Sequence, residues 1–201
     1  IIDRITNATV GAGVIRQEKS AYKQITSVTK DMRADRHHTK PKILWFTGLS
    51  GAGKTTIANA LEAELFNRGY ATYLLDGDNL RLGLNKDLDF TPENRTENIR
   101  RAGEVAKLFV DAGHIVLCAF ISPFEKDREL VRSLVAPEEF VEIYVSTSFS
   151  ECAKRDTKGL YAKDVRALRS YEVPQHPDIV LDTEKLSLED CVNSILFAIS
   201  F

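Results

Sequence analysis

The residues with the clearest chemical signature form a glycine-rich stretch, in which four residues separate Gly48 from Gly53, Lys54 and Thr55. Glycines let the backbone curl so that successive N–H groups point at one anion, and a helix starting at Lys54 adds its positive dipole end. The lysine can reach the β- and γ-phosphates of ATP, and the threonine hydroxyl suits the Mg²⁺ that bridges them. We predict a phosphate-binding loop made by Gly48, Leu49, Ser50, Gly51, Ala52, Gly53, Lys54, Thr55 and Thr56.

The flanks of this loop match the same interpretation. A continuous apolar run precedes it at 43–47, and an amphipathic pattern with Ile57, Leu61 and Leu65 follows it. A glycine-rich turn without a ligand requires neither flank, and is the weaker alternative. The loop alone indicates a nucleotide as phosphate donor but does not identify the phosphate acceptor, because motors, GTPases and small-molecule kinases all use such a loop. The sequence has no Asn-Lys-x-Asp motif for a guanine base, and 201 residues are few for a motor. A small kinase fits best.

Two carboxylates, Asp76 and Asp78, follow the second expected strand. The carboxyl ends of parallel strands line the site in an open α/β sheet, so these groups could bind water on Mg²⁺ and accept a proton from an attacking hydroxyl. A turn that uses Asp and Gly for their backbone tolerance is an equal alternative. We take Lys54, Asp76 and Asp78 as candidate catalytic residues, and Thr55 and Asp78 as candidate Mg²⁺ ligands. The sequence does not divide the two aspartate roles.

A basic and aromatic stretch comes next. Arg81 and Arg95 bracket Phe90, and Asn98 follows. Arginines suit a phosphate or sulfate, and an aromatic ring suits the face of a purine. Each residue taken singly could equally belong to a solvated helix face.

Alternating strand and helix patterns must position these groups. Strands are expected at 43–47, 71–75, 114–121, 140–145 and 178–181. Helices are expected at 54–67, from the cap Thr91 to Gly113, at 123–134, from Ser148 onward and at 187–200. The pattern predicts an α/β fold of the P-loop NTPase type, with an open parallel five-stranded sheet and helices on both faces.

The first 42 residues differ from the remainder. The stretch 1–10 reads as a strand, and residues 14–42 hold eight Lys or Arg against three Asp or Glu. We expect a solvated linker at 16–42, with docking of a partner domain as the alternative. Because the chain starts at Ile1 in what reads as a strand, we interpret it as a piece of a longer polypeptide. The expected divisions are 1–15, 16–42 and the kinase domain 43–201.

Bulk composition narrows the partners and the compartment. The net charge of −2 argues against a general nucleic-acid or membrane binder. Three widely spaced cysteines show no metal-binding spacing and suit a reducing cytoplasm. No apolar stretch is long enough to span a bilayer. We expect a cytoplasmic protein that binds neither nucleic acid nor membrane.

The chain resembles adenylylsulfate kinase, or APS kinase, from about Ser27 to its end. The resemblance rests on Thr-Gly-Leu-Ser-Gly-Ala-Gly-Lys at 47–54, on Asp-Gly-Asp-Asn-Leu-Arg at 76–81, and on further blocks at 97–101, 103–109, 120–123, 156–161 and 171–174. It implies transfer of the γ-phosphate of ATP to the 3′-hydroxyl of adenosine 5′-phosphosulfate (APS), which gives 3′-phosphoadenylyl sulfate (PAPS). Another small acceptor, or a non-catalytic domain that regulates a fused sulfurylase, are the alternatives.

The same resemblance implies roles for individual residues. Matching positions place Arg81, Arg95 and Asn98 on the phosphosulfate and nucleotide, and Phe90 on the acceptor adenine. Ile121 and Ser122 line the same pocket, and Lys158 and Leu160 close over the nucleotides. The corresponding serine of the family has been described as a phosphorylated intermediate. Since direct in-line transfer needs none, we expect Ser122 to line the pocket, and keep a covalent catalytic role as the alternative.

Two features concern the ends of this resemblance. Between Tyr161 and Tyr171 the family usually carries a longer lid with a Phe-Thr-Gly-Ile segment, which this sequence lacks. Either the lid is short, which predicts weak acceptor binding, or residues are missing between Leu168 and Arg169, which we favour. Residues 1–15 resemble the last strand of the GTP-dependent subunit of sulfate adenylyltransferase. This implies a fused sulfate adenylyltransferase domain or subunit as a partner, and the family also implies a homodimer.

Overall fold

A five-stranded sheet runs through the middle of the molecule. The computed structural model describes residues 26–156, 159, 161 and 170–199. The strands are β1 (Lys42–Thr47), β2 (Thr72–Asp76), β3 (Ile115–Ala119), β4 (Phe140–Ser146) and β5 (Ile179–Asp182). Their spatial order is β2-β3-β1-β4-β5, and every neighbouring pair is parallel. The predicted fold class is confirmed.

The central strand explains why the sequence reads as a continuous apolar run. From Ile43 to Thr47 every residue of β1 is buried. Leu44 and Phe46 belong to one core, on the side of α2 (Lys54–Asn67) and α9 (Leu188–Ala198). Ile43 and Trp45 belong to the other, on the side of α4 (Pro92–Asp111). Because side chains alternate along a strand, a strand covered on both faces is apolar throughout.

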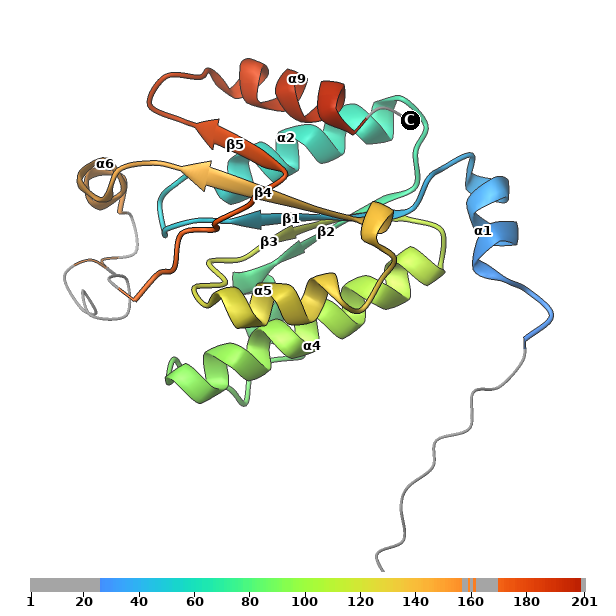
Figure 1. Ribbon diagram of the computed structural model, residues 1–201, viewed down its shortest axis with the longest axis horizontal. Helices are drawn as coiled ribbons and strands as arrows, with labels where there is room; N and C mark the ends of the chain where they lie inside the picture. The colour runs from blue at the N-terminus through green and yellow to red at the C-terminus, as the bar shows by residue number, and fades with distance from the viewer. Residues whose placement is uncertain (1–25, 157–158, 160, 162–169, 200–201) are drawn as a thin grey trace, which may run out of the picture.

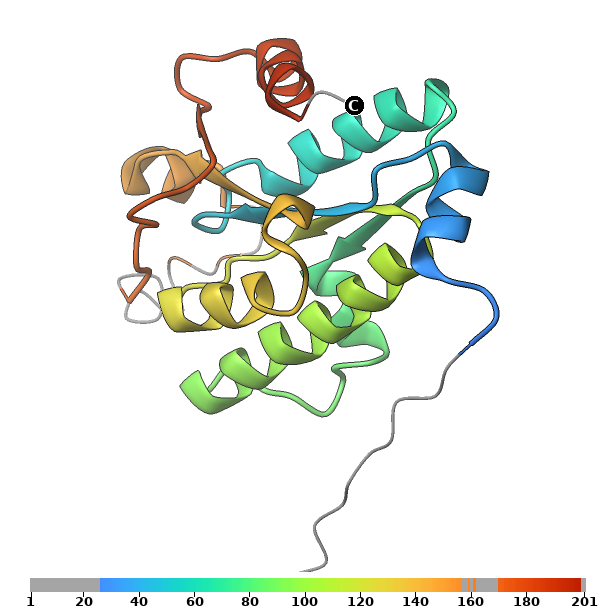
Figure 2. The ribbon, with the colours of Figure 1, turned by 45° about the vertical axis from the view of Figure 1, so that its right-hand side comes forward.

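Helices cover both faces of the sheet (Figure 1). Helices α2 and α9 lie together on one face, and α4 lies with α5 (Glu125–Arg132) on the other. Figure 2 shows the same two layers from a direction turned by 45°. Helix α6 (Phe149–Lys154) lies beyond the carboxyl end of β4. The two packed layers leave the carboxyl ends of the strands at one edge, where the loops can form a site.

The capping residues read from the sequence begin the helices as expected. The Thr91 hydroxyl accepts from the Asn94 N–H at the start of α4, and Pro92 occupies the first turn. The Ser148 hydroxyl accepts from the Glu151 N–H at the start of α6. Each bond satisfies one backbone donor that the first turn leaves without a helical partner. Local sequence therefore set these helix starts correctly.

Three short elements were not predicted, and one of them changes the interpretation of the N-terminal part. These are α1 (Lys30–His37), α3 (Gly77–Leu82) and the 3-10 turn η1 (Pro137–Glu139). Helix α1 lies within the segment expected to be a solvated linker. Its Ala34 is buried, and Arg33 pairs with Asp111 at 2.7 Å.

Beyond α1, the Thr39 hydroxyl donates to the Gly113 carbonyl at 2.6 Å. Gly113 has φ +84°, and a Cβ there would lie 2.9 Å from Ala34 N. Helix α1 is therefore packed through the close approach of its backbone to Gly113 rather than through a stripe of apolar side chains. Residues 30–39 therefore include a helix that contacts the domain at Asp111 and Gly113, which a wholly solvated segment would not do. The strand expected at 1–10 lies outside the described residues.

Candidate active site

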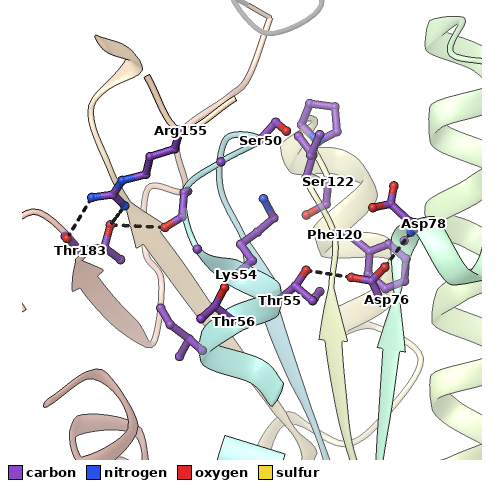
Figure 3. A pocket seen from close by; sticks show the side chains of 18 of the residues that line it. Ser50, Lys54, Thr55, Thr56, Asp76, Asp78, Phe120, Ser122, Arg155 and Thr183 are labelled. Atoms are coloured by element: carbon purple, nitrogen blue, oxygen red, sulfur yellow. Dashed lines mark hydrogen bonds between the residues drawn. The ribbon is translucent and has the colours of Figure 1, made fainter. Parts of the chain in front are cut away.

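A cavity of about 690 Å³ opens at the carboxyl ends of the strands. Its walls come from the glycine-rich loop, the start of α3, the first half of α4, and the loop after β3. Further walls come from the segments after α6 and β5. The lining side chains with polar groups are Ser50, Lys54, Thr55, Thr56, Asp76, Asp78, Arg81, Arg95, Asn98, Ser122, Arg155, Asp156 and Thr183. Figure 3 shows several of them facing a shared space around Lys54. The topology thus gathers residues more than a hundred positions apart.

The glycine-rich loop wraps around its own lysine. The Lys54 ammonium donates to the carbonyls of Gly48 at 3.0 Å and Leu49 at 2.7 Å. Gly48 has φ +147°, and a Cβ there would lie 2.6 Å from the Val145 carbonyl, so no other residue fits. Of the predicted loop residues, Ser50, Gly51, Ala52, Gly53, Lys54, Thr55 and Thr56 line the cavity. Gly48 and Leu49 lie behind it, where their carbonyls hold the lysine.

The two aspartates have different surroundings. Asp76 ends β2, and one carboxylate oxygen accepts the Thr55 hydroxyl at 2.8 Å. Its other oxygen accepts the N–H groups of Asp78 at 2.9 Å and Asn79 at 3.4 Å, which caps α3. Asp76 therefore joins the phosphate loop to the start of α3 (Figure 3). Asp78 lies in the first turn of α3, and its side chain lines the cavity.

Phe90 lies close to two guanidinium groups at one end of the cavity. Its side chain is exposed, and the Cζ atoms of Arg81 and Arg95 lie 4.3 Å and 5.7 Å from its ring centroid. Arg81 also donates to the Leu88 carbonyl, and Arg95 donates to the Phe90 carbonyl, both at 2.9 Å. Burial, and then the charge of Arg95, lower the pKa of Arg81. The predicted cluster therefore forms in the folded chain, with Arg81 and Arg95 both beside one ring.

Asn98 joins this group from the buried side of α4. Its Oδ1 atom accepts the Asn85 side-chain amide at 3.0 Å, with both residues buried. This bond fixes the plane of the carboxamide at the cavity wall, because a planar amide held at one end cannot turn freely. All four residues predicted for the acceptor side thus line one cavity: Arg81, Phe90, Arg95 and Asn98.

Ser122 is almost fully buried, at 1% exposure. Its hydroxyl accepts the Trp45 indole N–H at 3.1 Å and donates to the Thr47 hydroxyl at 2.9 Å. The Thr47 hydroxyl in turn donates to the Ile121 carbonyl at 2.9 Å. Ile121 and Ser122 both line the cavity. The serine proton is therefore directed at another hydroxyl rather than at a base.

The opposite end of the cavity contains residues that the sequence reasoning missed. They are Arg155, Thr183, Leu186, Leu188 and Cys191. Arg155 donates to the Thr183 hydroxyl at 3.1 Å, and that hydroxyl reaches the Ala52 carbonyl at 3.3 Å (Figure 3). Thr183 directly follows β5, so the rule that strand ends line the site could have found it. Arg155 carried no such signal.

The segment after α6 is described only in part. Lys158 and Leu160, which the sequence places over the nucleotides, lie outside the described residues. Residues 162–169, to which the short-lid alternative refers, lie outside the described residues too. Tyr161 is described, and its hydroxyl donates to the Ser50 carbonyl of the phosphate loop at 2.6 Å. The end of the 156–161 block therefore contacts the loop directly.

No helix within the described ranges combines the length and the apolar character that a membrane span requires. Cys118, Cys152 and Cys191 are all buried as free thiols.

Comparison with known proteins identifies close relatives. The family model described as adenylylsulphate kinase matches residues 40–182. The adenylyl-sulfate kinase of Staphylococcus epidermidis is 51% identical over 179 residues, which cover 85% of this chain and 90% of that relative. The bifunctional enzyme NodQ of Rhizobium sp. (strain N33) is 52% identical over 207 residues, which cover 97% of this chain and 32% of the relative. This chain thus spans about a third of NodQ.

A solved structure shares both the fold and the sequence. It is that of the Mycobacterium tuberculosis APS kinase CysC in complex with AMPPNP and APS. The two chains are 38% identical with a TM-score of 0.76, and the match covers 81% of this chain and 99% of the other. Together with the family match, this confirms the resemblance read from the sequence.

Proposed function

The chain belongs to the adenylylsulphate kinase family and is therefore a kinase, and on that premise we propose that it phosphorylates APS. In this reaction the γ-phosphate of ATP passes to the 3′-hydroxyl of APS, and the products are PAPS and ADP. One observation carries the proposal: the phosphate loop lies midway along a single cavity with a guanidinium group at each end. Such a cavity can bind two nucleotides with their phosphates meeting at Lys54.

The donor end is the one beside Arg155 and Thr183. A guanidinium plane and aliphatic side chains suit the flat face of adenine, and the backbone N–H groups of the glycine-rich loop suit the triphosphate. The Lys54 ammonium already lies within the curl of the loop, held by two carbonyls. We propose that it exchanges these carbonyls for the β- and γ-phosphate oxygens when ATP binds.

The groups beside Lys54 fit a magnesium ion bound with ATP. Mg²⁺ prefers oxygen donors, and in nucleotide sites it takes one or two from the protein and others from phosphates and water. The Thr55 hydroxyl and the adjacent Asp76 carboxylate, 2.8 Å apart, supply that chemistry. We propose that Thr55 and a carboxylate of the aspartate pair hold the ion, with Asp78 as the second candidate. Bound there, Mg²⁺ would neutralise charge on the β- and γ-phosphates.

The acceptor end is the one beside Phe90. We propose that the adenine of APS stacks on this ring, while Arg81, Arg95 and Asn98 hold the phosphosulfate and the nucleotide. The Arg81 guanidinium lies 4.3 Å from the ring centroid. We propose that a purine on that face of the ring displaces the guanidinium toward the anion. Ile121, Ser122, Lys158 and Leu160 complete the proposed set.

The chemical step follows from the separate surroundings of the aspartates. We propose that Asp78 accepts the proton of the APS 3′-hydroxyl while the 3′-oxygen forms a bond to the γ-phosphorus of ATP. The bond from that phosphorus to the β-γ bridging oxygen breaks in the same step. Asp76 holds Thr55 and caps α3, and so positions both neighbours. A phosphoserine at Ser122 is disfavoured, because its hydroxyl donates to Thr47 and is almost fully buried.

The proposal extends to the whole protein. We propose that the chain is the kinase part of a protein that also carries a sulfate adenylyltransferase domain, and that the kinase part forms a homodimer. The resemblance of residues 1–15 and the match to the bifunctional NodQ over 97% of this chain support the first point. Free buried thiols support a reducing compartment such as the cytoplasm.

A comparison of acceptors tests the activity. The purified chain with ATP and Mg²⁺ would be given APS, AMP or shikimate, and ADP release would be followed with a coupled assay. Of the three acceptors, we expect turnover only with APS, and we expect the product to carry a phosphate on its 3′-oxygen. Turnover only with AMP or shikimate would refute the proposed acceptor. Nucleotide binding without any transfer would favour a non-catalytic domain.

A further inference from the structure

A buried arginine on α5, Arg128, lies behind the acceptor side of the cavity without lining it. Its exposed fraction is 2%. Its guanidinium makes three contacts in three directions: Nε lies 2.7 Å from a Glu142 carboxylate oxygen, one terminal nitrogen donates to the Ser122 carbonyl at 2.8 Å, and the other donates to the Glu172 carbonyl at 3.0 Å. One planar group therefore joins β4, the loop after β3 and the segment after residue 170.

The contact with Ser122 acts on an unusual stretch of backbone. Ser122 has φ +39°, a left-handed value that is costly for a residue with a side chain. Such a conformation persists only where its surroundings hold it. The bond from Arg128 fixes the direction of the Ser122 carbonyl, and the Trp45 and Thr47 contacts fix its hydroxyl. Together they set the course of the loop that forms one wall of the cavity.

The contact with Glu172 ties a second segment to the same loop. The Glu172 N–H donates to the Pro123 carbonyl at 2.8 Å, and the Glu125 N–H donates to the Glu172 carboxylate at 2.6 Å. The Tyr171 hydroxyl lies 3.0 Å from the Thr47 hydroxyl. Arg128 thus donates to two segments, the loop after β3 and the segment after residue 170, which are also bonded to each other.

The charge balance favours a geometric role. A buried arginine requires a compensating charge, and Glu142 supplies it with 7% of its own side chain exposed. Burying such a pair is a weak source of stability, because desolvation offsets most of the attraction. What apolar residues could not supply is a rigid fork that donates to two carbonyls while its charge faces the Glu142 carboxylate, and a lysine cannot match that geometry either.

We propose that Arg128 is a positioning residue of the acceptor site, which holds the Ser122 carbonyl and the Glu172 carbonyl in the register that acceptor binding requires. The inference rests on the proposed function, since it concerns the acceptor end of the same cavity. It predicts that a substitution of Arg128 weakens acceptor binding. Binding of ATP at the donor end, built from α2, α6 and β5, should be unaffected.

The Arg128→Lys variant tests this, with Arg132→Lys as the matched control. Arg132 lies one turn further along α5 and pairs with Glu142 at 3.3 Å and Asp178 at 3.0 Å, and neither partner belongs to the loop after β3. We expect Arg128→Lys to raise the KM for APS about 10- to 100-fold, as for the loss of bonds made by a charged group, with the KM for ATP within twofold. Arg132→Lys should leave both unchanged. An unchanged KM for APS, or an equal rise in both KM values, would overturn the proposal.

A second variant and a second readout cover misfolding and inactivity. Glu142→Asp keeps both charges but draws the carboxylate away from Nε, and should raise the KM for APS severalfold with the KM for ATP unchanged. Trp45 is the single tryptophan and donates to Ser122. Its emission without substrates should therefore shift in Arg128→Lys and stay as in the wild type in Arg132→Lys. If the wild type fails to phosphorylate APS, the proposed function falls, while an unchanged emission would overturn the role of Arg128 independently.

Discussion

Replacing Asp76 with asparagine separates the two tasks of this side chain. One oxygen accepts the Thr55 hydroxyl at 2.8 Å, and the other accepts two N–H groups at the start of α3. Asparagine keeps a carbonyl oxygen for the two N–H groups but presents an NH₂ donor to Thr55. The substitution therefore spares the helix cap and removes one bond to a charged group in the phosphate loop.

A lower limit on the effect follows from that single bond, because the Asp76 carboxylate is also a proposed ligand of Mg²⁺. A hydrogen bond to a charged group contributes about 1.5–3 kcal/mol, which corresponds to a loss in kcat/KM of about 10- to 150-fold. The Asp76→Ala variant also removes the cap, at about 1 kcal/mol of folding free energy. We therefore expect Asp76→Asn to unfold near the wild-type temperature, and Asp76→Ala to be less active and also less stable.

The assay is ADP release with ATP, Mg²⁺ and APS, together with thermal unfolding of each variant. Asp111→Asn is the control, because Asp111 pairs with Arg33 at the end of α4 and does not line the cavity. It should stay within twofold of the wild type. An Asp76→Asn variant that also stays within twofold would refute the role given to the Thr55–Asp76 bond.

Three further predictions concern other parts of the site. Lys54→Ala should lower kcat by at least about 100- to 1,000-fold, because it removes positive charge from the transferring phosphate, and near-normal turnover would contradict the loop assignment. Phe90→Ala should raise the KM for APS more than the KM for ATP, and the reverse pattern would place Phe90 at the other nucleotide. Hydrogen bonds from Thr91 and Asn94 hold the pKa of Asp89 at about 2, below its ordinary value of 3.8. Because the pKa of Asp89 is lower in the folded than in the unfolded chain, Asp89 should stabilise the fold fully above about pH 4, and this stabilisation should decline as pH falls toward 2. The measurement is the free energy of unfolding of the wild type and of Asp89→Ala as a function of pH. A difference between the two that stays constant with pH would contradict this.

Local patterns set most of the fold correctly for identifiable reasons. The run at 43–47 is typical of a strand covered on both faces, and Thr91-Pro92 is typical of a helix start. Short elements escaped because their signals are not periodic. Helix α3 depends on the Asp76 side chain as a cap, and α1 depends on the close approach of Gly113 to Ala34, which no pattern in 16–42 reveals.

The sequence by itself predicted the phosphate loop and the proposed acceptor cluster, because glycine spacing and the Arg81–Asn98 stretch are local in the chain. Only the tertiary structure decided which aspartate holds Thr55, since that depends on the parallel pairing of β2 and β3, which sets where β2 ends beside the loop. It also decided that Ser122 donates to Thr47 and that Arg155 and Thr183 close the far end of the cavity. These contacts join residues 21 to 75 positions apart, and such contacts are fixed by the order of the strands rather than by any local preference.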